Sequence, residues 1–432
     1  MPENKFITFF DNEKIILLSI IIIALFFRLI GLDQRELWYD EILTIQQSKL
    51  DLLQILKDVP TPIHYLFVKF FSYFSTDIIF LILGSIFFNL LSIYYLYIIV
   101  NSFDKNISIL CCFLFSISPM MIEFSKQVLF FSYFIFFALY HLHACILLSK
   151  NLVSKVNWIR FLISLIILPL TIMTSFPIII STCIFIFFQI IKKLKFKEKL
   201  LCIFFLFFSL SLILFYLFKY SQYSAWIIDS VINSESKEVY LGYSLSHLLA
   251  SQTINNLFLF YASMFKWFGF GTYYELPILL SFFCIGFYYS FIKDKYVTLL
   301  FISLFIISFF LLFAFKINHW FEEKYFVYLI PIYLIFISSG IYYFSSLFKS
   351  NLLYRSIYYF LILFFLIYLS INGFMKSTSF GYDFDGHTQF SFNKAITKLE
   401  EDFGAKYIFV RNTDYMFASL YNNKSQIIPD GD

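Results

Sequence analysis

The chain leaves its first long apolar run through the sequence FRLIGLDQRELWYDEI, residues 27–42. The apolar run itself covers 15–31, and polar residues become frequent directly after it. Two adjacent acids, Asp40 and Glu41, follow the aromatic pair Trp38 and Tyr39. A helix needs roughly 20 apolar residues to cross about 30 Å of hydrocarbon. The stretch is therefore predicted to mark the point where a first membrane span meets water.

The composition of the whole chain supports this interpretation. Of its 432 residues, 60% are apolar and only 14% are charged. A soluble domain carries roughly 25% charged residues, and a larger soluble protein could not hide so much apolar surface. The excess apolar surface must face lipid, which excludes soluble, disordered and fibrous classes. All six cysteines lie inside apolar runs, so neither a disulfide framework nor a zinc knuckle is indicated.

Further apolar runs predict an all-α polytopic membrane protein with about eleven spans. They lie near 15–31, 77–100, 106–124, 127–148, 157–173, 175–191, 200–218, 276–292, 296–315, 325–345 and 355–371.

Basic residues between the runs predict the sidedness. One set of connections carries clusters of Lys and Arg, at 105, 150–160, 192–199, 293–295 and 349–355. The short connections of the opposite set carry only Lys126, Lys316 and Lys324. By the positive-inside rule the first set is cytoplasmic. The N-terminus is then inside and the C-terminus outside. The net charge of +4 sits in these clusters, so they indicate topology rather than a nucleic-acid partner.

Three longer polar segments are predicted outside, at 32–76, 219–275 and after 372. The first shows helical spacing of apolar residues from Glu41 to Leu56 and an aromatic-rich stretch from Pro62 to Phe74, which predicts two juxtamembrane helices. The stretch 247–270 is expected to be interfacial or re-entrant. We expect a transmembrane domain over 1–372 and, over 373–432, a small α/β appendage with a helix near 391–402 and a strand at 407–410.

The two acids of the opening stretch are the first candidates for chemistry. Partial desolvation at the membrane boundary raises the proton affinity of a carboxylate, which suits a general base. The ordinary alternative is the hydrated first turn of an amphipathic helix, where acids are favoured.

The stretch also resembles the GT-C glycosyltransferases, which are multi-span enzymes that move a sugar from a polyprenyl-phosphate carrier to an acceptor on the outer face. The pattern is an Arg at the end of the first span followed by Leu-Trp-x-Asp-Glu, here Arg28 and residues 37–41. Weaker similarities are Thr61-Pro62-Ile63-His64-Tyr65, Ser118-Pro119, and Lys324-Tyr325 with Pro331. The nearest branch contains the lipid A aminoarabinose and protein mannosyltransferases.

The resemblance implies an inverting displacement, with Asp40 as general base and Glu41 beside it in the catalytic motif. The leaving phosphate needs positive charge, for which Arg28, Lys126 and Lys324 are the nominated cations. Arg28 could instead snorkel to the interface, and the two lysines could be ordinary loop charges.

Four further residues are candidates for substrate binding: His64, Tyr65, Glu123 and Tyr325. A divalent metal ion such as Mg, Mn or Zn is a further expectation, with Asp40 and Glu123 as its ligands.

The sequence also departs from the family pattern. Gln127, Val128 and Leu129 stand where family members often carry Glu-Ala-Arg. Pro60 stands at a basic or His position, and Thr174-Ser175 replaces a Thr-His pair. His141 and His143 lie near the cytoplasmic end of a span and are not expected to be ligands.

The leading hypothesis is a hexosyl- or pentosyltransferase in a bacterial inner membrane. Its partners would be a polyprenyl-phosphate-linked sugar, membrane lipid, and a glycan, lipid or protein acceptor in the envelope, as in lipopolysaccharide or protein glycosylation. A transporter or flippase of a lipid-linked substrate is one alternative, although the spans carry few ionisable residues at mid-depth. A non-catalytic, degenerate family member is another, because of the departures at Gln127, Leu129 and Ser175.

Overall fold

The computed structural model describes the part of the chain that contains most of the predicted spans. The described residues are 13–32, 37, 39–59, 61–172, 175–196, 198–200, 202–203, 207, 211, 276–315, 327–347, 356, 360, 364, 367, 407–410 and 426–429. Its helices are α2 (Glu13–Leu29), α3 (Tyr39–Ser48), α4 (Leu52–Asp58), α5 (Pro62–Ser72), α6 (Ile78–Asn101), α7 (Lys105–Ile117), α8 (Pro119–Ser125), α9 (Phe131–Lys150), α10 (Lys155–Thr171), α11 (Phe176–Lys193), α17 (Leu276–Lys293), α18 (Lys295–Phe315) and α19 (Leu329–Ser346).

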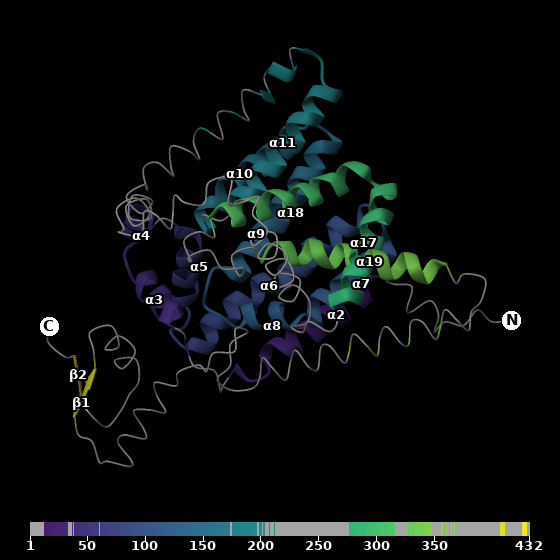
Figure 1. Cartoon of the computed structure of the whole chain (residues 1–432). Coiled ribbons are helices and arrows are strands. Elements are labelled where there is room, and N and C mark those ends of the chain that lie inside the picture. The colour runs from purple at the N-terminus through teal and green to yellow at the C-terminus, as the bar shows by residue number, and fades with distance from the viewer. Residues whose placement is uncertain are drawn as a thin grey trace, which may run out of the picture.

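The described helices are those of an all-α membrane protein (Figure 1). Four of them, α6, α9, α11 and α19, are long and apolar enough to cross a bilayer. The pair α7 and α8 adds a fifth if it forms one broken span. The predicted spans at 200–218 and 355–371 and the predicted re-entrant stretch 247–270 lie outside the described residues, apart from isolated positions. The total of eleven spans therefore stays a prediction.

The predicted span at 106–124 is bent by 59° between α7 and α8. Pro119 is the first residue of α8. A proline has no N–H to donate, and its ring clashes with the carbonyl four residues earlier, so α7 cannot continue through it. The bend leaves carbonyls at the end of α7 in need of other donors.

The segment 32–76, predicted to be external, also differs from its prediction. One helix was expected from Glu41 to Leu56, and the structure has two, α3 and α4, separated at Lys49–Asp51. Asp51 caps α4 through a capping box with Gln54, which starts a new helix there. The second expected helix is confirmed as α5, which begins at Pro62. Helices α3, α4 and α5 pack together (Figure 1).

The core of the described helices is apolar and closely packed. Helix α6 packs against α7 and α9, and α9 also packs against α10 and α11. Helices α17 and α19 approach so closely that their backbones touch. A Cβ atom on Gly286 would overlap the carbonyl oxygen of Phe336, and one on Gly340 would overlap that of Phe282. Small residues at a helix interface permit this approach in membrane proteins.

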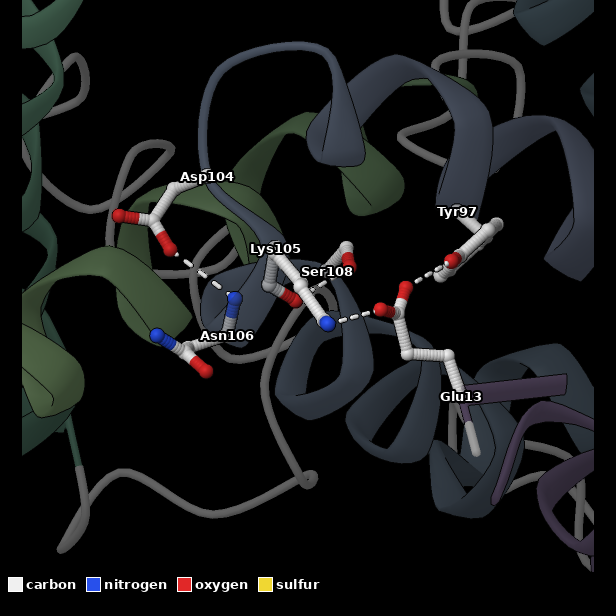
Figure 2. Close-up of polar contacts among 6 residues, drawn as sticks. All are labelled: Glu13, Tyr97, Asp104, Lys105, Asn106 and Ser108. Atoms are coloured by element: carbon white, nitrogen blue, oxygen red, sulfur yellow. Dashed lines mark hydrogen bonds and ion pairs between the residues drawn. The ribbon is translucent and has the colours of Figure 1, made fainter. Parts of the chain in front are cut away.

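One end of the helices is joined by polar contacts (Figure 2). The Glu13 carboxylate pairs with Lys105 and accepts a 2.7 Å hydrogen bond from the Tyr97 hydroxyl, which joins α2, α6 and α7. Asp104 caps α7 and accepts a 3.1 Å hydrogen bond from Tyr289 of α17. This end carries Lys105, Lys293 and Lys295, which belong to the set of basic connections predicted to be cytoplasmic.

The predicted strand at 407–410 is present as β1 (Tyr407–Val410), which pairs in parallel with β2 (Gln426–Pro429). In register, Tyr407 lies opposite Gln426 and Val410 opposite Pro429. The predicted helix at 391–402 lies outside the described residues, so the appendage and the division at 372 remain predictions.

Candidate active site

The two acids of the motif lie in the first turn of α3. Asp40 is exposed, whereas the side chain of Glu41 is completely buried. Successive residues of a helix point about 100° apart, so one acid faces outward while its neighbour faces the protein. The Thr44 hydroxyl donates a 2.8 Å hydrogen bond to the Asp40 carbonyl, which holds this turn in helical form.

Glu41 joins α3 to a distant part of the chain. Its Oε1 accepts a 2.7 Å hydrogen bond from the backbone N–H of Val128. Val128 lies in the turn 126–130, between the end of α8 and the start of α9. A charge-assisted bond of this kind is stronger than a neutral one, and burial increases its strength further. The contact fixes the first turn of α3, and with it Asp40, against the turn 126–130.

The same turn makes two further contacts with predicted site residues. Lys126, only 4% exposed, donates a 2.8 Å hydrogen bond from Nζ to the carbonyl of Ile30, just past the end of α2. Phe130 lies against His64 of α5, with 6.0 Å between ring centroids. The end of α2, helix α3 and helix α5 therefore all contact the turn 126–130. Glu123, one turn earlier and half-buried, accepts a long 3.4 Å hydrogen bond from Gln127.

Arg28 lies completely buried between α2, α6 and the end of α7. Its Nε donates to Asn89 Oδ1 at 2.9 Å, and its Nη1 donates to the carbonyls of Ala24 at 2.9 Å and Ser116 at 3.0 Å. The Ser116 carbonyl is one of those released by the break before Pro119. Arg28 thus stabilises the broken span and does not snorkel to the membrane surface. Its Nη2 is buried without a hydrogen-bond partner among the described residues.

His64 and Tyr65 lie in the first turn of α5. His64 is 3% exposed, its ring centroid is 3.8 Å from that of Tyr65, and its Nδ1 has no hydrogen-bond partner in the described part of the chain. Burial lowers the pKa of His64 to about 3, so the ring is neutral near pH 7. Tyr65 is half-buried beside it.

Several predicted positions are not brought to this site or are not described. Lys324, Tyr325, Trp38 and Pro60 lie outside the described residues. Ser175 is buried at the start of α11.

His141 bridges three helices within the bundle. Its Nδ1 lies 2.8 Å from Ser164 Oγ of α10, and its Nε2 lies 2.9 Å from Thr182 Oγ1 of α11. These contacts give His141 a role in helix packing.

Sequence reasoning missed the importance of the turn 126–130. It treated Val128 only as a departure from a family motif, but the contact to Glu41 uses the backbone N–H, which any residue except proline supplies. No side-chain pattern could have identified this contact.

The metal expectation rests on Asp40 and Glu123. Among the residues that the structure describes, no group of three or more His, Cys, Asp or Glu side chains is placed to hold a metal ion. The two carboxylates alone do not make up such a ligand set. The chemistry proposed below therefore uses only the chain's own side chains.

Comparison with solved structures gives an independent view of this fold. The crystal structure of an oligosaccharyltransferase from Archaeoglobus fulgidus in complex with Zn and sulfate superposes with a TM-score of 0.58, at 12% identity over 96% of this chain. The fold is similar to that of an archaeal oligosaccharyltransferase. Its apo form gives a TM-score of 0.53 at 14% identity, over 96% of this chain. Its complex with an inhibitory peptide and a dolichol-phosphate gives 0.52 at 14% identity, over 97%.

At 12–14% identity the likeness is one of fold alone. The present chain spans 61–62% of the length of these oligosaccharyltransferase chains. No protein-family model and no curated protein matches the sequence.

Proposed function

We propose that this protein is a membrane glycosyltransferase that uses a polyprenyl-phosphate-linked sugar as donor. It transfers the sugar, a hexose or a pentose, to an acceptor in the cell envelope, on the extracytoplasmic face of a bacterial inner membrane. The GT-C-like fold and the motif Leu-Trp-Tyr-Asp-Glu support the reaction class. One observation carries the proposal. Asp40 is exposed, whereas its neighbour Glu41 is buried and accepts a hydrogen bond from the Val128 N–H.

In the proposed reaction Asp40 accepts the proton of the acceptor hydroxyl. The acceptor oxygen attacks the anomeric carbon, and the bond from that carbon to the phosphate oxygen breaks. Polyprenyl phosphate leaves with the bonding electron pair, so the anomeric configuration is inverted and no covalent enzyme intermediate is formed. A positioned general base of this kind contributes roughly 10²–10⁴-fold to the rate.

The structure suggests separate roles for the two acids. Asp40 is accessible to an acceptor, whereas Glu41 holds the first turn of α3 to Val128, so we assign Glu41 to positioning Asp40. His64, Tyr65 and Glu123 lie on the elements around the turn 126–130 and are proposed to contact the substrates, together with Tyr325.

Positive charge for the leaving phosphate is assigned to Arg28, Lys126 and Lys324. Arg28 is completely buried and its Nε and Nη1 donate to protein oxygens, so its charge would act on the phosphate through space and not by direct contact. Lys126 donates a hydrogen bond to the Ile30 carbonyl, just past the end of α2. Both cations that the structure describes therefore lie close to the end of α2.

The test compares Asp40→Asn with Asp51→Asn. Asp51 is an exposed acid of the same external segment, and Asn is an equally good helix cap, so its variant is a matched control. We expect cells with Asp40→Asn, like cells that lack the gene, to accumulate glycosylated polyprenyl phosphate, whereas we expect Asp51→Asn to behave as wild type. The readout is mass spectrometry of extracted lipids, with membrane levels of each variant measured in parallel.

Transfer at a near wild-type rate in Asp40→Asn would overturn the role of Asp40. If purified wild-type protein in vesicles moves labelled polyprenyl-phosphate sugar across the bilayer without altering it, the protein is a transporter. If deletion of the gene changes no lipid or glycan pool, the departures at Gln127, Leu129 and Ser175 indicate a non-catalytic member of the superfamily.

A further inference from the structure

A groove of about 550 Å³ lies at the basic end of the helix bundle, remote in sequence from the site described above. Its apolar walls include Leu152, Trp158, Leu162, Leu194 and Cys202. It runs between the first two turns of α10 and the segment that follows α11. Its volume lies within the range of roughly 300–1,000 Å³ that small-molecule sites occupy.

The walls of the groove are held by hydrogen bonds. The Trp158 indole donates from Nε1 to the Leu152 carbonyl at 2.8 Å, so its only polar atom is satisfied and the ring presents apolar surface. Lys193, at the end of α11, donates from Nζ to the carbonyl of Ser149 in α9 at 2.8 Å. The first contact fixes the turn 151–154 to α10, and the second holds the end of α11 against the end of α9.

The chain around the mouth of the groove carries an excess of basic residues. Two exposed charged residues line it, Lys155 and the acid Glu198, and four more lysines lie next to the lining residues in sequence: Lys150, Lys193, Lys195 and Lys199. Between 150 and 199 the chain has eight basic residues and one acid, Glu198. An occupant of the groove therefore combines an apolar body with an anionic group at the mouth.

We propose that the groove binds an anionic glycerophospholipid of the surrounding membrane. One acyl chain lies along Trp158 and Leu162, and the phosphate lies near Lys155. Anionic lipids are attracted to basic clusters at helix ends, with an effect of about fivefold in affinity for each Lys near the surface. This site is independent of the proposed sugar transfer.

The experiment is native mass spectrometry of the full-length purified protein with two lipids of identical acyl chains, phosphatidylglycerol and phosphatidylcholine. We expect preferential retention of phosphatidylglycerol, reduced about fivefold by Lys155→Gln. Lys293→Gln, at another basic helix end, is the matched charge control and should leave retention unchanged.

Two further variants test the apolar part of the site. Leu162→Trp and Val153→Trp add bulk to the groove, and the second position is 71% exposed, so the fold tolerates the change. Both should reduce retention of phosphatidylglycerol. Ile163→Trp, at a position of α10 that does not line the groove and is 49% exposed, should not.

Equal retention of the two lipids would overturn the proposal, as would retention that Val153→Trp does not alter. Retention of neither lipid would show that another part of the chain fills the groove. Displacement of bound lipid by millimolar glycerol phosphate would show that the basic mouth binds a free phosphate and that the acyl chain makes no contribution.

Discussion

The Glu41 carboxylate and the Val128 backbone N–H, 87 residues apart in the chain, are joined by a 2.7 Å hydrogen bond. This contact ties helix α3 to the turn between α8 and α9. Because Asp40 precedes Glu41 in the same helical turn, the bond also limits where the Asp40 carboxylate can lie.

The first prediction concerns this bond. Glu41→Ala leaves the Val128 N–H buried without its acceptor, which costs about 1–3 kcal/mol. Glu41→Gln keeps an acceptor oxygen of similar geometry and should lose less. Thermal midpoints in detergent and hydrogen exchange at the Val128 amide measure both effects. Glu123→Ala is the control, because its carboxylate is only half-buried; equal losses in Glu41→Ala and Glu123→Ala would contradict the assignment.

The second prediction concerns Arg28. Arg28→Met leaves the Asn89 side-chain oxygen and the released carbonyl of Ser116 buried without their donor, and each orphaned acceptor should cost about 1–3 kcal/mol. Asn89→Leu combined with Arg28→Met removes the orphaned amide as well. The double variant should therefore be more stable than Arg28→Met alone, measured as folded fraction against temperature. A double variant less stable than either single one would show that Asn89 has another essential partner.

The third prediction is a pH dependence from His64. Its pKa falls from an ordinary value near 6.5 to about 3 on folding, because burial disfavours the charged ring. The unfolded chain therefore binds a proton below pH 6.5 that the folded chain does not, and stability falls as the pH is lowered from 6.5 toward 3. At pH 5 the loss relative to pH 7 is about 2 kcal/mol from this residue.

His64→Phe should reduce that pH dependence while keeping the ring contact with Phe130. Thermal midpoints measured at pH 5 and pH 7 for wild type and variant give the difference directly. If both proteins lose the same stability between these pH values, His64 is not buried in its neutral form.

The fourth prediction concerns the contact between α17 and α19. In an exposed helix, Gly→Ala would stabilise by about 1 kcal/mol. At Gly286 or Gly340 the new methyl group overlaps a backbone carbonyl of the other helix, so each change should instead destabilise by about 1–3 kcal/mol. Ser281→Ala, on the exposed face of α17, is the control. Stabilisation by Gly286→Ala would show that the helices are farther apart.

The sequence by itself determined the class of protein and the position of most described helices. Long apolar runs must be shielded from water, so runs such as 77–100 and 175–191 could be assigned without knowledge of the fold. The motif around Asp40 and Glu41 was visible because two adjacent acids and an aromatic pair follow shortly after an apolar run. Local chemistry also fixed the start of α5 at Pro62.

Only the tertiary structure decided which of two neighbouring acids is buried, because that depends on the helix face that meets the turn 126–130. It also decided the partners of Arg28, which come from α2, α6 and the end of α7. The Ser116 carbonyl, released by the break before Pro119, accepts a hydrogen bond from Arg28 because the fold places α2 beside the end of α7. Some contacts are made by backbone groups, such as the Val128 N–H and the Ser116 carbonyl. Such contacts do not depend on which side chain the residue carries, so no sequence pattern could have predicted them.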